Sequence, residues 1–265
     1  MPRATVIEEL SAGVLLITLS RPQRKNAFNH QMWCDLRDAL AAAQQADAVR
    51  VVVVTGAGDA FSAGQDLSEM LGGSPAGAGA EHGFGTFMDR LCAFDKPLLA
   101  AVNGVGVGIG LTFLLHCEYV YIARGARLRA PFITLGVVPE AASSYLLPAL
   151  LGFRKAIDLL FESDFISAER AVELGIATHL CDPEVTQSAA LEHARRLATK
   201  PLGSLRWTKR LLLATRREQV AAARQREDEA FLHRVGSPEN LEAIAAFFEK
   251  RPPDFSNVPP TDRES

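Results

Sequence analysis

The chain has 265 residues, 48% of them hydrophobic and 22% charged, with a formal net charge of -3 at pH 7. This composition is typical of a globular protein with a large core, and the charge argues against binding nucleic acid through a broad basic surface. No apolar run reaches membrane-spanning length, and the charged N-terminus has no apolar signal core, so we expect a cytoplasmic protein without membrane contact.

Neither the cysteines nor the histidines form a known ligand pattern. The four cysteines are scattered without a CxxC pair, and the six histidines show no HExxH or similar spacing. We therefore expect reduced cysteines and no metal site.

The first part of the chain combines strands with one helix. Val14–Leu19 reads as a strand, and residues 5–8 are predicted to pair with it as a hairpin. Residues 30–46 carry apolar side chains at helical spacing, which predicts an amphipathic helix. Residues 51–55, four valines and a threonine, are typical of a buried strand.

Two stretches share one plan: a buried strand, a glycine-rich turn and the start of a helix. The first leads from residues 51–55 into AFSAGQDL at 60–67, and the second leads from Leu98–Val102 through four alternating glycines into an apolar run at 111–115. Lying about 50 residues apart, they predict repeating modules in one sheet system. Residues 72–85 between them, rich in Gly, Ala and Pro, are predicted to be a loop, either a lid or a plain insertion.

Strands and helices continue to alternate up to residue 181. The further predicted strands are Tyr119–Ala123, 128–130 and 177–181, and the predicted helices are 140–149, 153–161 and 167–174. Ser167 suits a helix N-cap and Gly175 a helix stop.

From residue 183 onward the composition changes, and only helices are predicted. These helices cover residues 183–199, 202–215, 218–235 and 238–248. The sequence therefore predicts an α/β fold with a core in residues 1–199 and a helical C-terminal region in residues 200–265, which we expect to take part in oligomerisation.

The glycine-rich turns suit an anion, because a strand, a turn and a helix start leave backbone N–H groups unpaired at one point. Their spacing is GxGxGxG and not the dinucleotide pattern GxGxxG, and neither a P-loop nor a GxSxG elbow occurs. Two such turns in one sheet system could each direct an N–H group at the same oxygen, forming an oxyanion hole. They could equally be tight turns in which glycine only permits sharp geometry.

Five motifs resemble, in order, those of the crotonase superfamily, the enoyl-CoA hydratase/isomerase family. They are RPQRKNAFN at 21–29, GAGDAFSAGQDL at 56–67, AVNGVGVGIGLTF at 101–113, ISAERAVELGIATHL at 166–180 and FFEKRPPDF at 247–255. The resemblance covers nearly the whole chain. It implies a spiral of ββα units with a helical C-terminal region that forms a homotrimer or a dimer of trimers.

The same resemblance implies an acyl-CoA thioester substrate whose enolate is stabilised by two backbone N–H groups. By motif position these belong to Gln65 and Ile109. The coenzyme A channel would be lined by residues of the two glycine motifs, namely Ala63, Gly64, Asp66, Leu67 and Gly108. Of these, Asp66 is expected to cap the next helix and not to touch the substrate.

The sequence departs from the hydratases of the family at two substrate-site positions. Where the resemblance places the two hydratase glutamates, this chain has Thr112 and Phe132. Hydration needs groups that deprotonate water and protonate carbon, and neither side chain exchanges a proton near pH 7. The resemblance therefore gives no support to hydration.

Glu140 offers a different carboxylate. It follows Pro139 in a stretch, VVPEAASSY, that resembles the peroxisomal-type Δ3-Δ2-enoyl-CoA isomerases, in which a glutamate at this place is the only base. Partial desolvation would raise its pKa and make it a better base. Alternatively, Glu140 is a first-turn glutamate favoured by the helix dipole.

We therefore predict an enoyl-CoA isomerase in which Glu140 is the base and Gln65 and Ile109 supply the oxyanion hole. Arg24, Lys25 and Lys250 are predicted to bind the coenzyme A phosphates, although each could be a solvated surface charge. Coenzyme A is part of the substrate, and no cofactor is expected. The alternatives are another crotonase reaction, such as hydration or thioester hydrolysis, and a non-catalytic acyl-CoA-binding protein.

Overall fold

The structure is a computed structural model that describes residues 4–71 and 83–259. Within these residues the strands form one six-stranded and one four-stranded sheet. In order across the larger sheet the strands are β1 (Val6–Ser11), β2 (Val14–Leu19), β3 (Val51–Gly56), β5 (Leu98–Val102), β7 (Tyr119–Ala123) and β10 (His179–Cys181). The smaller sheet consists of β4 (Ala60–Ser62), β6 (Val105–Val107), β8 (Arg127–Arg129) and β9 (Ile166–Ser167).

The larger sheet is parallel from β2 to β10, and β1 joins it as the antiparallel half of a hairpin. Leu16, Val53 and Leu99 lie side by side on adjacent strands. Both faces are buried, which explains the continuous apolar runs in these strands. The predicted hairpin and the strands at 51–55, 98–102 and 119–123 are confirmed, with β1 extending to Ser11.

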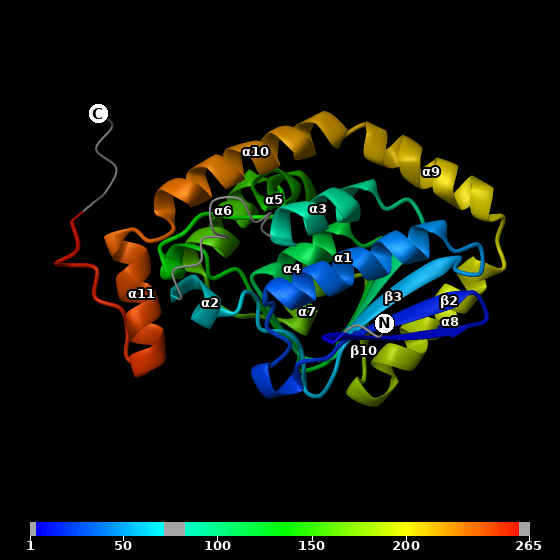
Figure 1. The fold of residues 1–265 in the computed structure, drawn as a ribbon, viewed down its shortest axis with the longest axis horizontal. Helices are drawn as coiled ribbons and strands as arrows, with labels where there is room; N and C mark the ends of the chain where they lie inside the picture. Colours follow the sequence, from blue (N-terminus) through cyan, green and yellow to red (C-terminus); the bar gives the residue numbers. More distant parts are fainter. Residues whose placement is uncertain (1–3, 72–82, 260–265) are drawn as a thin grey trace.

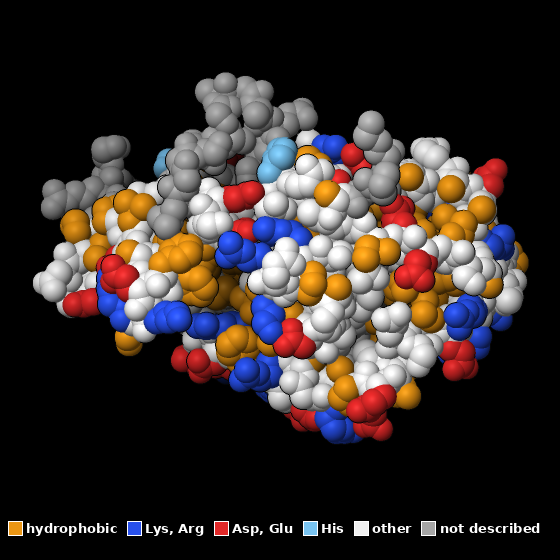
Figure 2. Space-filling view, turned by 60° about the horizontal axis from the view of Figure 1, so that its bottom comes forward, with side chains coloured by type: hydrophobic (Ala, Val, Ile, Leu, Met, Phe, Trp, Pro, Cys, Tyr) orange, Lys and Arg blue, Asp and Glu red, His pale blue; other side chains and the backbone are white. Residues whose placement is uncertain are grey.

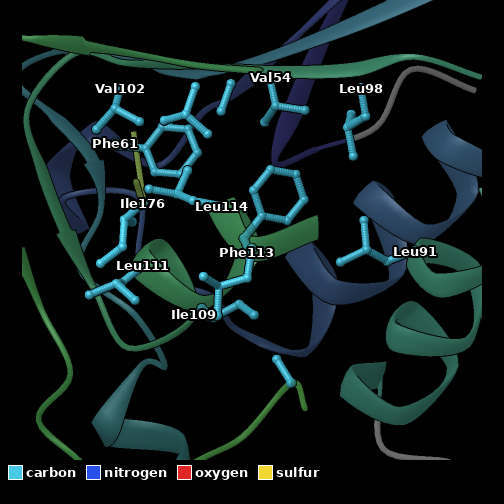
Figure 3. Close-up of a cluster of buried hydrophobic side chains, with 14 of the residues drawn as sticks. Val54, Phe61, Leu91, Leu98, Val102, Ile109, Leu111, Phe113, Leu114 and Ile176 are labelled. Atoms are coloured by element: carbon cyan, nitrogen blue, oxygen red, sulfur yellow. The ribbon is translucent and has the colours of Figure 1, made fainter. Parts of the chain in front are cut away.

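Each face of the larger sheet packs against its own helices. Alternate residues such as Val51 and Val53 contact α8 (Thr186–Ala198) through its alanines. The intervening residues, such as Val52 and Val54, face the main core beneath α1 (His30–Gln45) and α3 (Gly83–Ala93). Figure 3 shows Phe113 in this core between Val54 and Ile109.

The glycine-rich stretches contain short second strands that the pattern of the sequence does not indicate. β3 leads to β4 and then α2 (Leu67–Leu71), and β5 leads to β6 and then α4 (Ile109–Thr112). The repeated unit is therefore ββα, the unit that the family resemblance implies. Three-residue strands are too short to show a period, and Gly106 in β6 is needed because a β-carbon there would lie 2.9 Å from the backbone carbonyl oxygen of Gly110.

Two expectations about local structure are wrong. The helix expected at 140–149 is α5 (Ser143–Leu151), so Glu140 lies in the loop before it. The loop expected at 72–85 ends earlier, because α3 begins at Gly83. Phe84, Phe87 and Leu91 recur at helical spacing, and their packing outweighs the low helix propensity of glycine. Residues 72–82 lie outside the described part, so the proposed lid is not tested.

The predicted helices at 153–161, 167–174 and in the C-terminal region are present, and Ser167 caps α7 through a hydrogen bond from the Arg170 N–H group. The remaining helical elements of the described chain comprise these helices and four short 3₁₀ helices, which the sequence did not predict as separate elements. They are η1 (Pro22–Arg24), η2 (Phe113–His116), η3 (Ile133–Leu135), α6 (Phe153–Glu162), α7 (Ala168–Glu173), η4 (Pro183–Val185), α9 (Leu202–Ala214), α10 (Arg217–Arg234) and α11 (Pro238–Glu249). Figure 1 shows α9 and α10 running along one side of the molecule, beyond α3 and α5. α10 packs against α5, and α11 packs against η3.

Candidate active site

The two glycine motifs meet at Gly64 and Gly108. A β-carbon on Gly64 would lie 2.8 Å from the carbonyl oxygen of Val107 and 3.8 Å from the Cα atom of Gly108. Both glycines also have positive φ angles, +91° and +54°, which side chains rarely permit. Glycine is therefore required at this junction, and the residues that follow, Gln65 and Ile109, are brought close together.

The N–H group of Gln65 points away from the adjacent segment around Phe28. Phe28 forms a parallel bridge with Gln65, in which the Phe28 N–H donates to the Gly64 carbonyl at 2.7 Å and the Asp66 N–H donates to the Phe28 carbonyl at 2.8 Å. Backbone groups alternate in direction along an extended segment, so the N–H of Gln65 faces the opposite side. Its side chain is held elsewhere, because Gln65 Oε1 accepts a hydrogen bond from Trp33 Nε1 at 3.1 Å.

Ile109 is the first residue of α4, and its N–H group belongs to the first helical turn, which lacks acceptors within the helix. The N–H groups of Leu111 and Thr112 instead donate to the Gly108 carbonyl, at 2.8 and 2.9 Å. In residues 4–71 and 83–259, neither the Gln65 nor the Ile109 N–H donates a hydrogen bond. Both groups are thus available to an oxygen of a ligand.

The Glu140 carboxylate faces this junction. Its Oε1 atom lies 3.9 Å from the position that a β-carbon of Gly108 would occupy. The side chain is half-buried, and no residue of the described chain donates a hydrogen bond to the carboxylate. Burial raises the pKa of Glu140 to about 8, and the negative charges of Glu227 and Asp228 add to the effect. The carboxylate is therefore a strong base for its type.

Glu140 does not stand in a first helical turn, so the helix-dipole interpretation is wrong. It precedes Ala141 and Ala142, which adopt left-handed conformations with φ angles of +59° and +60° before α5 begins. Such conformations cost roughly 1 kcal/mol or more for residues other than glycine. Neighbouring elements must therefore hold this turn in place.

Two polar side chains that the sequence did not point to contact this turn. His116 at the end of η2 lies 2.9 Å from the Ala141 carbonyl oxygen, and Glu227 of α10 accepts hydrogen bonds from the Ala142 and Ser144 N–H groups. His116 follows an apolar run, which marks it as a buried histidine. Glu227 lies in a charged segment, RQREDEA, and nothing in that pattern separates it from exposed glutamates.

Thr112 and Phe132 are both buried. The hydroxyl of Thr112 faces the carbonyl oxygen of Gly108 at 3.4 Å, within its own helical turn. Neither residue has an ionisable side chain. The two positions where the resemblance places hydratase glutamates thus carry no acid–base group.

Asp66 caps α2, as expected. Its Oδ1 atom accepts hydrogen bonds from the Ser68 N–H at 3.2 Å and the Ser68 hydroxyl at 2.7 Å. The other oxygen pairs with Arg21 at 3.0 Å, and Arg21 also donates to the Ala27 carbonyl. Asp66 and Arg21 therefore join the start of α2 to the η1 turn. Ala63 is tied to the same turn, since its N–H donates to the Lys25 carbonyl at 2.8 Å.

The three basic residues predicted to bind phosphates are exposed. Lys25 pairs with Asp59 at 2.6 Å, whereas Arg24 and Lys250 form no side-chain ion pair within the described ranges. Figure 2 shows a recess with hydrophobic side chains among several Lys and Arg side chains on one face of the molecule.

A cavity of about 110 Å³ lies apart from these residues, between α3, α9 and α10. It reaches His116 but not Glu140, Gly64 or Gly108. Its lining consists of Leu91, Cys92, His116, Lys209, Leu213, Arg216, Arg217, Val220, Ala221 and Arg224. Elsewhere, no group of three or more His, Cys, Asp or Glu side chains among the described residues could hold a metal ion.

Comparison with known proteins identifies the family. Residues 9–258 match the family model of enoyl-CoA hydratase/isomerase. The chain is 34% identical over 247 residues to enoyl-CoA delta isomerase 2 of Rattus norvegicus, covering 91% of this chain and 62% of that protein. It is 33% identical over 242 residues to 2,3-dehydroadipyl-CoA hydratase of Escherichia coli (strain K12), covering 91% and 94%.

A crystal structure of enoyl-CoA hydratase/isomerase from Pseudoalteromonas atlantica T6c has the same fold. The TM-score is 0.89 at 36% sequence identity, and the match covers 95% of this chain and all of that one. The predicted α/β spiral with a helical C-terminal region is therefore confirmed. By its sequence and its fold, the chain belongs to the enoyl-CoA hydratase/isomerase family of the crotonase superfamily.

Proposed function

We propose that this member of the family is an enoyl-CoA isomerase that moves the double bond of a 3-enoyl-CoA to the 2-position. One observation carries the proposal: the Glu140 carboxylate faces the Gly64–Gly108 junction, while the buried Thr112 and Phe132 stand where the family resemblance places the hydratase glutamates. A double-bond shift needs only one base, whereas hydration needs groups for both water and carbon. The arrangement favours the isomerase.

In the first step the thioester oxygen accepts hydrogen bonds from the Gln65 and Ile109 N–H groups. These donors are fixed by the backbone before the substrate binds, so they stabilise negative charge on the oxygen without reorganisation. Losing one such donor costs about 3–4 kcal/mol of transition-state stabilisation.

In the second step the ionised carboxylate of Glu140 removes a proton from C2. The electron pair of the C2–H bond spreads over the thioester oxygen, C2 and C4 as a dienolate, which the two N–H groups hold. Protonated Glu140 then returns the proton at C4, and the double bond forms between C2 and C3. The carboxylate is regenerated, and the net reaction is the movement of one proton and one double bond.

The coenzyme A portion is proposed to lie along residues 63–67 and to place its phosphates near Arg24, Lys25 and Lys250. All three side chains are exposed and carry a positive charge, which suits phosphate oxygens. Because Lys25 pairs with Asp59 on the surface, it would have to exchange that partner for a phosphate. Exposed pairs of this kind contribute little to stability, so the exchange is inexpensive.

We also propose a homotrimer or a dimer of trimers, assembled through the C-terminal region. The side chains of Trp207, Leu211 and Leu212 on α9 are each more than half exposed, and so is Leu232 on α10. Exposed apolar side chains gathered on helices are typical of protein interfaces.

The cytoplasmic location stays a prediction. No helix of the described residues has the length and apolarity to cross a membrane.

The test offers 3-enoyl-CoA and 2-enoyl-CoA to the wild type, to Glu140→Gln and to a matched control, Glu229→Gln. Glu229 is an exposed glutamate of α10 that binds only Gln225 among the described residues. We expect wild type and control to convert 3-enoyl-CoA to 2-enoyl-CoA and to exchange the C4 protons of the product with D2O, and Glu140→Gln to do neither.

Three other outcomes would contradict the proposal. Hydration of 2-enoyl-CoA that persists in Glu140→Gln would indicate a hydratase with a different carboxylate. Release of free coenzyme A thiol would indicate a thioester hydrolase. Binding of acyl-CoA without turnover or C2 proton exchange in the wild type would indicate a non-catalytic acyl-CoA-binding protein.

A further inference from the structure

The turn that carries Glu140 is unusual because two successive alanines adopt left-handed conformations. The φ angles of Ala141 and Ala142 are +59° and +60°, and the Ser143 N–H donates back to the Glu140 carbonyl at 3.0 Å. This conformation directs the chain from Glu140 into α5 within three residues. Alanine does not favour it, so contacts from outside the turn must maintain it.

Glu227 supplies the main external contact. Its Oε2 atom accepts a hydrogen bond from the Ala142 N–H at 2.7 Å, and its Oε1 atom accepts one from the Ser144 N–H at 2.8 Å. The side chain is 6% exposed and comes from α10, which lies 83 residues further along the chain than Ser144. One carboxylate therefore fixes both the Ala141–Ala142 and the Ser143–Ser144 peptide groups.

His116 holds the turn from the other side. Burial lowers its pKa to about 4, so the ring is neutral at pH 7, and its Nε2 atom lies 2.9 Å from the Ala141 carbonyl oxygen. A carbonyl oxygen can only accept, so Nε2 carries the hydrogen and donates it. His116 of η2 and Glu227 of α10 thus form hydrogen bonds with the backbone of the turn, while the Glu140 carboxylate itself receives no hydrogen bond from the described chain.

We propose that Glu227 is a positioning residue for the reaction of Glu140: by binding the Ala142 and Ser144 N–H groups, it holds the strained turn in the conformation that points the Glu140 carboxylate at Gly108. The inference rests on the proposed function, in which Glu140 is the base. It assigns a role in catalysis to α10, a helix of the C-terminal region that the sequence indicated only for oligomerisation.

The charges around Glu140 allow positioning to be separated from electrostatics. Glu227 and its neighbour Asp228, both on α10, are the charged groups that raise the pKa of Glu140, and His116 on η2 is neutral. Asp228 is exposed and makes no contact with the turn. Asp228→Asn therefore removes a charge without removing a hydrogen bond. Glu227→Asp keeps the charge but is one methylene too short to reach both N–H groups.

The experiment measures kcat, KM and the pH dependence of kcat/KM for 3-enoyl-CoA in wild type, Glu227→Asp, Glu227→Gln and Asp228→Asn. We expect Glu227→Asp to lose about tenfold or more in kcat on the high-pH plateau, with KM changed by about twofold at most and the acid limb near its wild-type position. Glu227→Gln should lose kcat and also move the acid limb to lower pH. Asp228→Asn should move the acid limb and retain the plateau kcat.

Folded fractions at the assay temperature are taken from thermal unfolding, and kcat is expressed per folded molecule. If both Glu227 variants keep the wild-type plateau kcat, the inference is overturned, because the turn then holds without this contact. A loss in Asp228→Asn as large as in Glu227→Asp would overturn it as well, since charge and not position would then account for both. Glu140→Gln separates a failure of the proposed function from a failure of the positioning role. If Glu140→Gln stays active, the proposed function is wrong. If it is inactive while the Glu227 variants have normal activity, only the positioning role is wrong.

Discussion

The carboxylate of Glu140 and the backbone of Gly108 face each other, and no other side chain of the described residues lies within 4 Å of the place of a Gly108 β-carbon. The Oε1 atom lies 3.9 Å from where a β-carbon of Gly108 would sit, and Gly108 is followed by Ile109, whose N–H is available to a ligand. A base and an oxyanion donor thus border the same space. In an acyl-CoA, the reacting carbon C2 and the thioester oxygen are both bonded to the carbonyl carbon, so one small space accommodates both.

Gly108→Ala tests this space. Gly108 has a φ of +54° and a ψ of -119°, a conformation that L residues rarely adopt, so the substitution strains the backbone by about 1–3 kcal/mol. Among the described residues, the atoms nearest to this β-carbon would be Glu140 Oε1 and the Gly64 Cα atom, both at 3.9 Å, so it causes no clash there. We expect the strain to displace the Ile109 N–H and to lower kcat by about 100-fold in steady-state assays with 3-enoyl-CoA.

Gly125→Ala is the matched control for the strain. Gly125 has a φ of +88°, is exposed, and a β-carbon there would meet nothing within 4 Å. It should lose a similar amount of stability and no activity. Equal kcat in Gly108→Ala and Gly125→Ala would show that the Ile109 N–H does not contribute to the reaction.

The pH dependence of activity follows from the pKa of Glu140, which burial and then the charges of Glu227 and Asp228 raise to about 8. The base must be ionised to accept the C2 proton, and ionisation increases as the pH rises. We therefore expect kcat/KM to increase about tenfold per pH unit below about pH 8 and to level off above it. A profile that is flat between about pH 6 and pH 9 would contradict a titrating Glu140 base.

The same pKa predicts a pH-dependent stability difference between wild type and Glu140→Gln. Between the unfolded value of 4.5 and the folded value of about 8, the folded wild type keeps a proton that the unfolded chain releases. The wild type therefore loses stability relative to Glu140→Gln as the pH rises through this window. Allowing for the partial exposure of the side chain, the loss is about 3 kcal/mol.

Urea unfolding of both proteins at pH 5 and pH 9 measures the difference, because groups remote from Glu140 titrate equally in the two chains. Glu140→Gln should gain stability over the wild type between the two pH values. A constant difference would mean that Glu140 ionises in the folded protein as it does in the unfolded chain.

The sequence predicts the larger sheet well and the short strands of the smaller sheet poorly, for different physical reasons. Apolar runs such as Val51–Gly56 are buried on both faces. A strand of this kind needs an apolar residue at nearly every position, so its composition alone predicts it. The strands β4 and β6 have three residues each and contain small side chains, so no period is visible in them. Their pairing depends on the neighbouring strands.

At the candidate site the sequence predicted the residues proposed to react, but not the contacts that hold them in place. Glu140 and the glycines are marked by the family resemblance, yet the left-handed turn after Glu140 was expected to be helix, because its alanines favour a helix locally. The turn exists because His116 and Glu227, from distant parts of the chain, bind its peptide groups. Contacts across 25 and 85 residues leave no local pattern.

A final prediction concerns how the C-terminal helices are attached to the core. Asp95, which is almost fully buried, accepts hydrogen bonds from Arg206 at 2.8 and 3.1 Å, from Arg210 at 2.6 Å and from Gln44 at 2.6 Å. Burial alone would raise the pKa of Asp95, but the hydrogen bonds from Arg206, Gln44 and Arg210 outweigh it and lower the pKa to about 2. This carboxylate thus joins α9 to α1 and to the start of β5.

Asp95→Asn should lower the free energy of unfolding by about 2 kcal/mol, because two guanidinium groups lose their charged partner while the side chain keeps its size. The control is Asp38→Asn, which breaks an exposed pair with Arg37 and should cost less than about 0.5 kcal/mol. Both are measured by urea unfolding at pH 7. Since the pKa of Asp95 is lowered on folding, its contribution is present above about pH 4 and is lost as the pH falls toward 2. Equal effects of the two substitutions would mean that α9 is held by its apolar contacts and not by this carboxylate.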